Sequence, residues 1–363
     1  MLQKFLKFIW HGTIGNLLWY LYAPKSIIKS NELNSIDAHY YEVEGLTYKI
    51  VQATDSTIFT NRVDNISFIV NNQLVPNVSW QFKDGKVLDD RFNELLIGKI
   101  HPRFPPKKIE GTVISLLTGG GGNYNYYHWL YDSLPRLKLC ESFLKGESKP
   151  RFLVPDNNLR FQKETLEYLG IDIDHQLSSK KYPHIKCDST IITSHPNPDE
   201  NRVPRWITEF LREKFLALKS TTNTGTPFVY ISRADQSNQR MLINEGDLLE
   251  LIEGFGFQVY KLSKLGFKDQ VSLFANAKIV MGVHGAGFAN LTFCNSGTSV
   301  IELFSCSYQP KMYTSISKNL NLDYHSFSYS DDTKKGKKNN NSHSIFLSEE
   351  DLDKIKTTLG KLV

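Results

Sequence analysis

Cysteine is scarce in this sequence, and the few cysteines lie far apart. Cys140, Cys187, Cys294 and Cys306 are the four cysteines of the 363 residues, no two form a C-x-x-C pair, and no cluster of histidines accompanies them. Zinc-binding and redox-active sites need such closely spaced groups. The pattern therefore argues against a metal or disulfide framework and indicates free thiols in a reducing, cytoplasmic compartment.

A long uncharged hydrophobic run is also missing. Residues 1–29 are apolar and aromatic, but Lys4 and Lys7 interrupt them, and no small-residue cleavage site follows. These features favour neither a membrane-spanning helix nor a signal peptide. Trp19 and Tyr20 with flanking lysines leave two interpretations open: an interfacial segment that lies on a membrane, or a helix packed on the protein's own core.

The sequence has no strong excess of charge of either sign. Its net charge is +5, and the basic residues are not clustered as they are in a nucleic-acid-binding domain. We therefore expect no nucleic-acid partner, although a mildly basic protein suits anionic ligands. The length of 363 residues is typical of two domains.

The hydrophobic pattern divides the chain into a β-rich part and an α/β part. Residues 38–118 are rich in β-branched and aromatic residues separated by Gly, Asn and Asp, which predicts strands and turns. From Asn125, apolar residues recur every three or four positions, so we expect a helix with a kink or break at Pro135. Strands and helices then alternate, which indicates a parallel sheet covered on both faces.

We expect the domain boundary in the polar, aperiodic segment 220–227. We predict an N-terminal domain over residues 1–219 and a Rossmann-like domain over residues 220–330. A mobile charged loop, residues 331–345, and a C-terminal helix, residues 346–363, which Ser348 caps, would follow.

The stretch VMGVHGAGFANLTF, residues 280–293, is typical of a phosphate-binding turn between a buried strand and a helix. Gly285 and Gly287 allow backbone N–H groups to approach a phosphate, and the start of the helix adds positive charge. His284 can donate to a phosphate oxygen. A glycine-rich turn without a ligand is an equally good interpretation of this motif alone, because Asn290 replaces the third glycine of the dinucleotide fingerprint.

Further candidates follow the neighbouring predicted strands. In YISRADQSNQR, Ser232 and Arg233 follow the first strand of the second half, where ligands of open α/β sheets bind. Arg233 and Arg240 can hold a pyrophosphate through bidentate contacts, although a solvated charged loop has the same composition. Glu302 lies on the strand after the glycine turn, where a carboxylate can bind ribose hydroxyls.

In NYYHWLYDSLPRL, His128 and Asp132 lie four residues apart and so share one face of the predicted helix. Either side chain can serve as the general base that activates an acceptor hydroxyl. The alternative is a half-buried aromatic helix without a chemical role.

Taken together, three segments resemble glycosyltransferase family 61 of the bacterial type, in this order and over roughly residues 112–325: NYYHWLYDSLPRL, YISRADQSNQRMLINE and VMGVHGAGFANLTFCNSGTSVIEL. The resemblance implies an α/β, GT-B-like fold in which two Rossmann-like domains face a cleft, with a β-rich N-terminal part and a C-terminal helix that crosses back to the first domain. It implies inverting, metal-independent transfer from a nucleotide sugar, usually a UDP-sugar, with no cofactor. The acceptor would be a glycan or lipid-linked glycan in capsular polysaccharide or lipopolysaccharide assembly.

The same resemblance assigns roles to individual residues. Residues 1–219 would carry the acceptor side, with Asp132 as the base or as the group that orients His128. Residues 220–330 would bind the donor through Ser232, Arg233, Arg240, His284, Gly285, Ala286, Gly287, Asn290 and Glu302. Residues 1–29 would then be a peripheral contact with the inner face of the cell membrane.

Two other classes of protein remain open. One is a non-catalytic glycan- or nucleotide-binding protein on the same fold. The other is an NAD(P)-dependent oxidoreductase, since a strand, a G-x-G turn, a helix, a strand and an acidic residue imitate a dinucleotide site. The missing third glycine argues against the second class.

Overall fold

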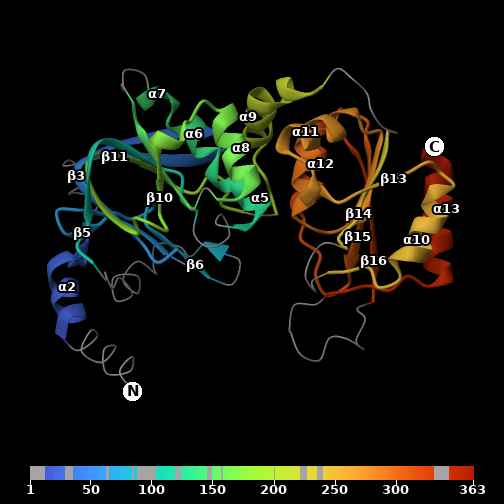
Figure 1. Ribbon diagram of the computed structural model, residues 1–363, viewed down its shortest axis with the longest axis horizontal. Helices are drawn as coiled ribbons and strands as arrows, with labels where there is room; N and C mark the ends of the chain where they lie inside the picture. The colour runs from blue at the N-terminus through green and yellow to red at the C-terminus, as the bar shows by residue number, and fades with distance from the viewer. Residues whose placement is uncertain are drawn as a thin grey trace. The chain divides into compact units, whose positions relative to one another are not determined.

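The chain forms two compact units, Met1–Pro198 and Asp199–Val363, in the computed structural model of Figure 1. The structure describes residues 13–28, 36–62, 65–83, 86–87, 104–118, 124–144, 149–156, 158–199, 201–220, 227–234, 240–330 and 343–363. Most of the predicted loop 331–345 lies outside these residues. The four cysteines are free thiols, as predicted; three are buried and Cys306 is exposed.

The first unit is built on one mixed sheet of 11 strands. Its main path runs β1-β5-β4-β3-β11-β8-β9-β10, while β2 pairs with β3 and β6 pairs with β4 and β7. The pairs from β11 to β10 are parallel and the pairs of β3 are antiparallel. The strand bounds are Ser26–Ile27 (β1), Asp37–Val43 (β2), Leu46–Thr60 (β3), Asn65–Val70 (β4), Gln73–Leu74 (β5), Trp80–Lys83 (β6), Lys86–Val87 (β7), Lys107–Ser115 (β8), Arg151–Val154 (β9), Gln176–Ser178 (β10) and His184–Thr193 (β11).

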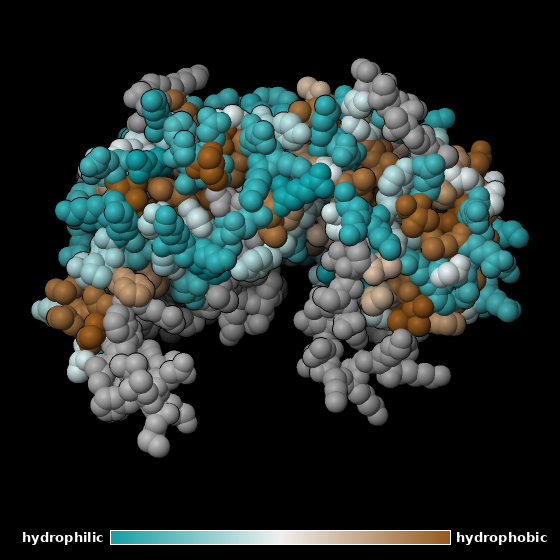
Figure 2. Space-filling model, in the orientation of Figure 1, coloured by the Kyte–Doolittle hydropathy of each residue, from teal (hydrophilic) through white to brown (hydrophobic). Residues whose placement is uncertain are grey.

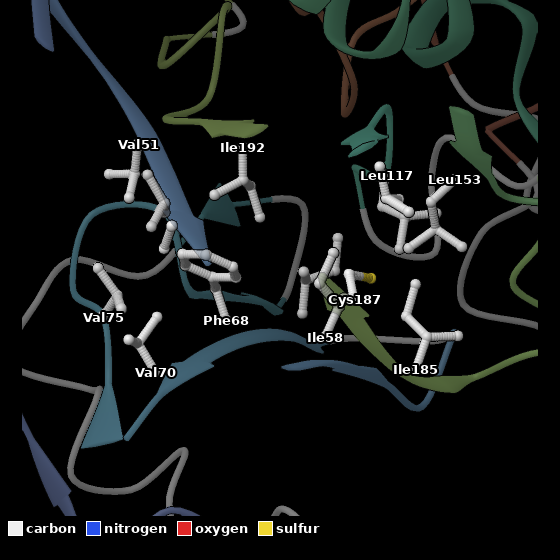
Figure 3. Packing of buried hydrophobic residues seen from close by; sticks show 14 of the residues in the cluster. Val51, Ile58, Phe68, Val70, Val75, Leu117, Leu153, Ile185, Cys187 and Ile192 are labelled. Carbon is white, nitrogen blue, oxygen red and sulfur yellow. The ribbon is translucent and has the colours of Figure 1, made fainter. Parts of the chain in front are cut away.

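Aliphatic and aromatic side chains from these strands form the core of the first unit. Figure 3 shows how they converge, among them Val51, Ile58, Phe68, Val70, Leu117, Leu153, Ile185 and Ile192. β-Branched residues suit a pleated surface that packs on both sides, and every residue of β4 is buried. The predicted β-rich character of residues 38–118 is confirmed where the structure describes them.

The helical segment that follows is broken, as the sequence predicts. It consists of Tyr126–His128 (α5), the π-helix Trp129–Ser133 (η4), Arg136–Leu139 (α6) and Glu141–Leu144 (α7). Leu134 N donates to Trp129 O at 3.1 Å, five residues back, so the turn is wider than an α-helical one. Pro135 follows and caps α6, because a proline has no N–H with which to continue the preceding helix. π-Helical turns of this kind are frequent at functional sites.

The remaining helices of the first unit are Gly15–Tyr22 (α2), Arg160–Tyr168 (α8) and the 3-10 turn Ile173–His175 (η5). On α2, Trp19 packs against a small buried cluster that contains Ala23, Phe59, Ile69 and Leu74. Four other residues of the segment are exposed and form a hydrophobic patch in Figure 2: Ile14, Leu17, Tyr20 and Leu21. One side of the segment therefore packs on the core, and a peripheral membrane contact stays a prediction. No helix in the described part of the chain is long and apolar enough to cross a membrane.

The second unit contains a five-stranded sheet in which every pair of neighbours is parallel. Its order is β13-β12-β14-β15-β16, with bounds Phe228–Ile231 (β12), Gln258–Tyr260 (β13), Ile279–Val283 (β14), Ser299–Ser305 (β15) and Asp323–Tyr329 (β16). Counted from β12, this is the order 2-1-3-4-5 of doubly wound folds, whose ligands bind where the order reverses. The predicted parallel sheet is confirmed, and β12 and β14 flank the switch point.

Helices cover both faces of this sheet. In Figure 1, α10 and α13 lie on one face, and α11 and α12 lie on the other. The bounds are Arg205–Phe215 (α9), Glu245–Glu253 (α10), Phe267–Asn276 (α11), Met312–Leu320 (α12) and Glu349–Leu362 (α13), with 3-10 turns at Leu216–Leu218 (η6), Leu262–Lys264 (η7) and Ala286–Phe293 (η8).

The C-terminal helix belongs to the second unit. Ser348 and Asp351 form a capping box at its start, which confirms the predicted cap. Ile355 and Leu359 are buried in the same cluster as the strands and α10. The resemblance implied a helix that crosses back to the first domain; instead, α13 buries its apolar side in its own unit.

The division between the units comes before α9, whereas the sequence suggested a boundary in residues 220–227. Arg212 on α9 donates through Nη1 to Thr292 O at 2.8 Å and to Cys294 O at 2.7 Å. These contacts attach α9 to the end of η8 in the second unit. They join residues 80 and 82 positions apart, so no local pattern reveals them.

Candidate functional site

The ends of β12 and β14 lie side by side at the switch point of the second sheet. Ile231 pairs with Gly282, and a Cβ built on Gly282 would lie 2.9 Å from Ile231 O. Only glycine therefore allows the two strands to approach this closely. Ser232 and Arg233 continue from β12, and His284 continues from β14.

Gly285 makes room for Arg233. A Cβ on Gly285 would lie 1.8 Å from Nη1 of Arg233, which is an impossible contact. A Cβ on Gly287 would meet Leu262 Cδ1 at 2.8 Å, the end of a flexible side chain that can move. The sequence suggested that both glycines admit a phosphate. In the structure, Gly285 admits the guanidinium group that would bind one.

The turn after His284 presents backbone donors. No described residue accepts a hydrogen bond from the N–H groups of Gly285, Ala286 or Gly287, which precede or begin η8. Tyr313 holds the turn by donating its hydroxyl to Gly285 O at 2.8 Å. The segment is a 3-10 helix rather than an α-helix, but N–H groups at the start of such a turn remain available as donors to an anion.

Asn290 supports this turn from inside. Its Nδ2 donates to Gln270 Oε1 at 2.9 Å and to Gly287 O at 3.1 Å, and the residue is fully buried. The sequence placed Asn290 among the donor-binding residues. The structure gives its amide a supporting role, because its donors are engaged by the protein.

Ser232, Arg240 and Tyr308 lie near the same turn. Ser232 is buried, and its Oγ accepts from Ala234 N at 3.2 Å. The guanidinium carbon of Arg240 lies 5.3 Å from the centre of the Tyr308 ring, whose centre is 5.5 Å from that of His284. Aromatic faces attract such cations. The tyrosine therefore connects Arg240 with the histidine of the turn.

His284 is bound to Glu302 on the neighbouring strand β15. The distance from His284 Nδ1 to Glu302 Oε1 is 2.5 Å, and Tyr324 donates its hydroxyl to Glu302 Oε2 at 2.6 Å. Glu302 is fully buried, and both of its oxygens are engaged. The sequence assigned Glu302 to the ribose hydroxyls; in this structure its carboxylate holds His284 instead.

Burial, assisted by two nearby arginines, keeps the imidazole of His284 neutral. Burial lowers the pKa of His284, the hydrogen-bonded Glu302 carboxylate acts in the opposite direction, and the charges of Arg240 and Arg233 lower it further. The site therefore combines two guanidinium groups and three backbone donors, which suit a phosphate-containing anion, with a neutral imidazole beside them.

A second cluster lies in the first unit, on the helical segment around η4. His128 Nδ1 and Asp132 Oδ2 are 2.6 Å apart, so the predicted pairing of these residues is confirmed. Asp132 is buried, while the side chain of His128 keeps 15% of its surface exposed. The imidazole is thus the member of the pair that solvent reaches.

His195 also lies in this cluster. Its Nε2 is 3.9 Å from Asp132 Oδ2, and burial lowers the pKa of His195 to about 4 although the nearby Asp132 carboxylate opposes the shift. His195 is not among the site residues predicted from the sequence. The available signal was a histidine directly after the carboxyl end of a predicted strand, where functional residues collect in α/β sheets.

The carboxylate of Asp132 stays ionised in this environment. Burial alone would raise the pKa of Asp132, but the charges of His195 and His128, with hydrogen bonds from His128 and Asn197, hold the pKa below its ordinary value. The buried Arg136 donates from Nε to Asp132 O at 3.1 Å. An ionised, fixed carboxylate can orient an imidazole and stabilise its protonated form.

Arg136 fastens this helical segment to the end of β11. Its Nη1 donates to Thr193 O at 2.8 Å, to Thr193 Oγ1 at 2.9 Å and to Ser194 O at 3.2 Å. Burial lowers the pKa of Arg136 to about 10, so it remains charged at neutral pH. The predicted site residues thus form two clusters, one in each unit.

Part of the chain matches a known family. Residues 126–301 match the family described as Glycosyltransferase 61. The residues of both clusters lie within this segment, except Glu302, Tyr308, Tyr313 and Tyr324, which follow it. The chain is therefore similar to the glycosyltransferase 61 family over these residues, in agreement with the resemblance noted in the sequence.

Curated relatives share shorter stretches. The EGF domain-specific O-linked N-acetylglucosamine transferase of Bos taurus is 35% identical over 78 residues, which cover 20% of this chain and 15% of that protein. The protein O-linked-mannose beta-1,4-N-acetylglucosaminyltransferase 2 of Mus musculus is 30% identical over 115 residues, which cover 30% of this chain and 19% of that protein. The chain thus matches less than a fifth of the length of these relatives.

Among solved structures, the iron-containing dodecameric glycosyltransferase TibC from enterotoxigenic E. coli H10407 aligns with 80% of this chain and 81% of its own. The TM-score is 0.29 and the sequence identity is 11%.

Proposed function

We propose that this protein is a glycosyltransferase that moves a sugar from a nucleotide sugar to a glycan acceptor. The observation that carries the proposal is the set of cationic and N–H donors at the switch point between β12 and β14. Arg233 lies against Gly285, and both Arg233 and Arg240 act electrostatically on His284. The family match over residues 126–301 supports the same activity.

In this proposal, the second unit binds the diphosphate of the donor. Arg233 and Arg240 neutralise the charge that develops on the leaving diphosphate, which is the task of the metal ion in metal-dependent enzymes. The N–H groups from Gly285 to Gly287 bind the same oxygens. Both relatives are named for N-acetylglucosamine transfer, which makes UDP-N-acetylglucosamine the first donor to test.

The first unit supplies the base. His128 takes the proton of the acceptor hydroxyl at Nε2, while Asp132 fixes its Nδ1 and stabilises the imidazolium that forms. The activated hydroxyl attacks the anomeric carbon on the face opposite the diphosphate, so the configuration is inverted. The GT-B arrangement and a capsular, lipopolysaccharide or lipid-linked acceptor are parts of this proposal.

Ligand-dependent thermal stability tests the donor class. UDP, UDP-N-acetylglucosamine, GDP, CMP, ADP and NAD are each added in the presence of EDTA to wild type, Arg233→Ala and the control Arg205→Ala. Arg205 pairs with Glu209 on the exposed side of α9. A ligand at about 100 times its Kd stabilises the folded state by roughly 2.7 kcal/mol.

We expect stabilisation by a uridine nucleotide that is retained in Arg205→Ala and lost in Arg233→Ala. Stabilisation by NAD alone would favour the oxidoreductase alternative. Uridine nucleotide binding without hydrolysis of the sugar donor or transfer to any glycan would favour the non-catalytic alternative.

The exposed side of α2 also supports a peripheral membrane contact. Leu17 and Leu21 are exposed there, and Lys25 Nζ lies 4.8 Å from the ring centre of Trp19 and 4.9 Å from that of Tyr20. A cation beside exposed aliphatic and aromatic groups suits an anionic lipid surface. We expect sedimentation with phosphatidylglycerol vesicles, reduced in Leu17→Glu/Leu21→Glu; equal sedimentation of the variant would contradict this contact.

A further inference from the structure

The buried chain Tyr324–Glu302–His284 has a function that the sequence did not predict. It crosses three neighbouring strands: His284 follows β14, Glu302 lies in the middle of β15 and Tyr324 lies near the start of β16. The hydrogen bonds are 2.5 Å and 2.6 Å long. A buried carboxylate with both oxygens engaged does not reach a ribose, so its effect must pass through the histidine.

The hydrogen-bond directions fix the tautomer of His284. Burial and the Glu302 carboxylate both raise the pKa of Tyr324, so the phenol keeps its proton and donates it to Glu302. An ionised carboxylate can only accept hydrogen bonds, so the second partner, Nδ1 of His284, must carry a proton. Because the two nitrogens face opposite edges of the ring, Nε2 points away from Glu302.

In the ligand-free state, this tautomer gives Nε2 a lone pair and no proton. A lone pair repels a phosphate oxygen, so the neutral imidazole is a poor ligand for a diphosphate. Protonation at Nε2 would make it a charged donor, with Glu302 behind it as the counter-ion. Arg233 and Arg240 oppose that protonation until an anion arrives to balance them.

We infer that Glu302 and Tyr324 are positioning residues for His284, and that binding of a nucleoside diphosphate is coupled to uptake of one proton from water by His284 Nε2. The proton forms an N–H bond that donates to a phosphate oxygen, while the Nδ1–H bond to Glu302 stays in place. This inference rests on the proposed function, since it needs a diphosphate at the turn.

The groups that face the imidazole come from every element around it. The charged and titratable ones are Arg233, Arg240, Glu302, Tyr308 and Tyr313, with Tyr324 acting through Glu302. Phe304 stacks on the ring with centres 5.2 Å apart. His284 is the imidazole of this set, the side-chain type whose ordinary pKa lies nearest to neutral pH.

Isothermal titration with UDP measures the coupling. The heat of binding is recorded at pH 7.5 in two buffers with different ionisation enthalpies. The difference between the two heats, divided by the difference between the two ionisation enthalpies, gives the number of protons taken up. The terminal phosphate of UDP has a pKa of about 6, and any loss of its proton has the opposite sign. We expect wild type to take up close to one proton, with affinity falling as pH rises.

Glu302→Gln is the informative variant. The amide oxygen can still accept from Nδ1, but the negative charge behind the imidazole is gone. We expect proton uptake to disappear in Glu302→Gln and UDP to bind at least tenfold more weakly at pH 7.5. We expect the same two changes in His284→Gln. Asp323→Asn, an exposed change on the neighbouring strand β16, is the matched control and should match wild type. Thermal unfolding without ligand verifies that each variant is folded.

The outcomes separate the two proposals. Binding of UDP with a heat that does not depend on the buffer would overturn this inference and leave the proposed function intact. Proton uptake that persists in Glu302→Gln would overturn the role of Glu302. If neither UDP nor UDP-N-acetylglucosamine binds wild type, the proposed function fails, and this inference fails with it.

Discussion

Each unit of the protein buries a carboxylate against an imidazole, and the two pairs differ in what surrounds them. In the first unit, His128 and Asp132 are 2.6 Å apart; in the second, His284 and Glu302 are 2.5 Å apart. The side chain of His128 is 15% exposed and that of His284 is 5% exposed. The same pair of groups is therefore accessible in one unit and enclosed in the other.

The surroundings suit the two pairs to different chemistry. Asp132 has a second imidazole, His195, 3.9 Å away, and its carboxylate can stabilise the protonated form of His128, which solvent reaches. His284 lies near two guanidinium groups and beside a turn with three N–H donors, which suits an anion. A carboxylate–imidazole pair therefore does not by itself define a general base. The charges around the pair decide whether it serves proton transfer or anion binding.

The largest expected effect comes from breaking the pair in the first unit. Asp132→Asn removes the charge that stabilises the His128 imidazolium, so we expect the rate of sugar transfer to fall by about 10²- to 10⁴-fold, the usual contribution of general base catalysis. Turnover is measured with UDP-N-acetylglucosamine and a glycan acceptor. Asp174→Asn, an exposed change on η5, is the control. A rate within threefold of wild type would show that this pair is not the base.

A smaller effect is expected from crowding the arginine in the second unit. Gly285→Ala would place a methyl group where Nη1 of Arg233 lies, so the guanidinium group must leave the turn. A charged hydrogen bond contributes roughly 1.5–3 kcal/mol, and we expect UDP to bind about 10- to 100-fold more weakly. Gly246→Ala on α10 is the matched control, because nothing lies within 4 Å of its added Cβ. Unchanged UDP affinity in Gly285→Ala would remove Arg233 from the donor site.

The smallest effect concerns stability rather than catalysis. The pKa of His195 is lowered from 6.5 to about 4, so the unfolded chain binds a proton between these values and the folded chain does not. Stability should therefore fall as pH decreases from 6.5 to 4, by on the order of 3 kcal/mol from this residue. Urea unfolding at pH 7 and pH 4.5 should show a smaller loss in His195→Asn than in wild type. Equal losses would mean that His195 is not buried as a neutral imidazole.

Local patterns predicted single elements in both units well. The alternation of strands and helices, the cap at Ser348 and the break at Pro135 are properties of a few adjacent residues, and the structure contains all three. The pairing of His128 with Asp132 followed in the same way from helical spacing. The mixed sheet of the first unit did not follow, since strand order depends on contacts far apart in the chain.

The contacts of single residues did not follow from the sequence where the partner is distant in the chain. Tyr324 lies 22 positions from Glu302, and no motif marks it, so the carboxylate was interpreted as a ribose ligand. His195 and Asp132 are joined only by the fold. Gly285 was correctly chosen as a residue that needs open space, but the group that fills this space is the side chain of Arg233, which sequence spacing does not place.

The UDP dissociation constants of Asp132→Asn and Glu302→Gln, measured side by side at pH 7.5, test the central claim most directly. The claim is that the enclosed pair serves donor binding and the accessible pair serves transfer. We expect Asp132→Asn to bind UDP as wild type does and Glu302→Gln to bind it at least tenfold more weakly. Equal weakening in both variants, or weakening in Asp132→Asn alone, would contradict the account.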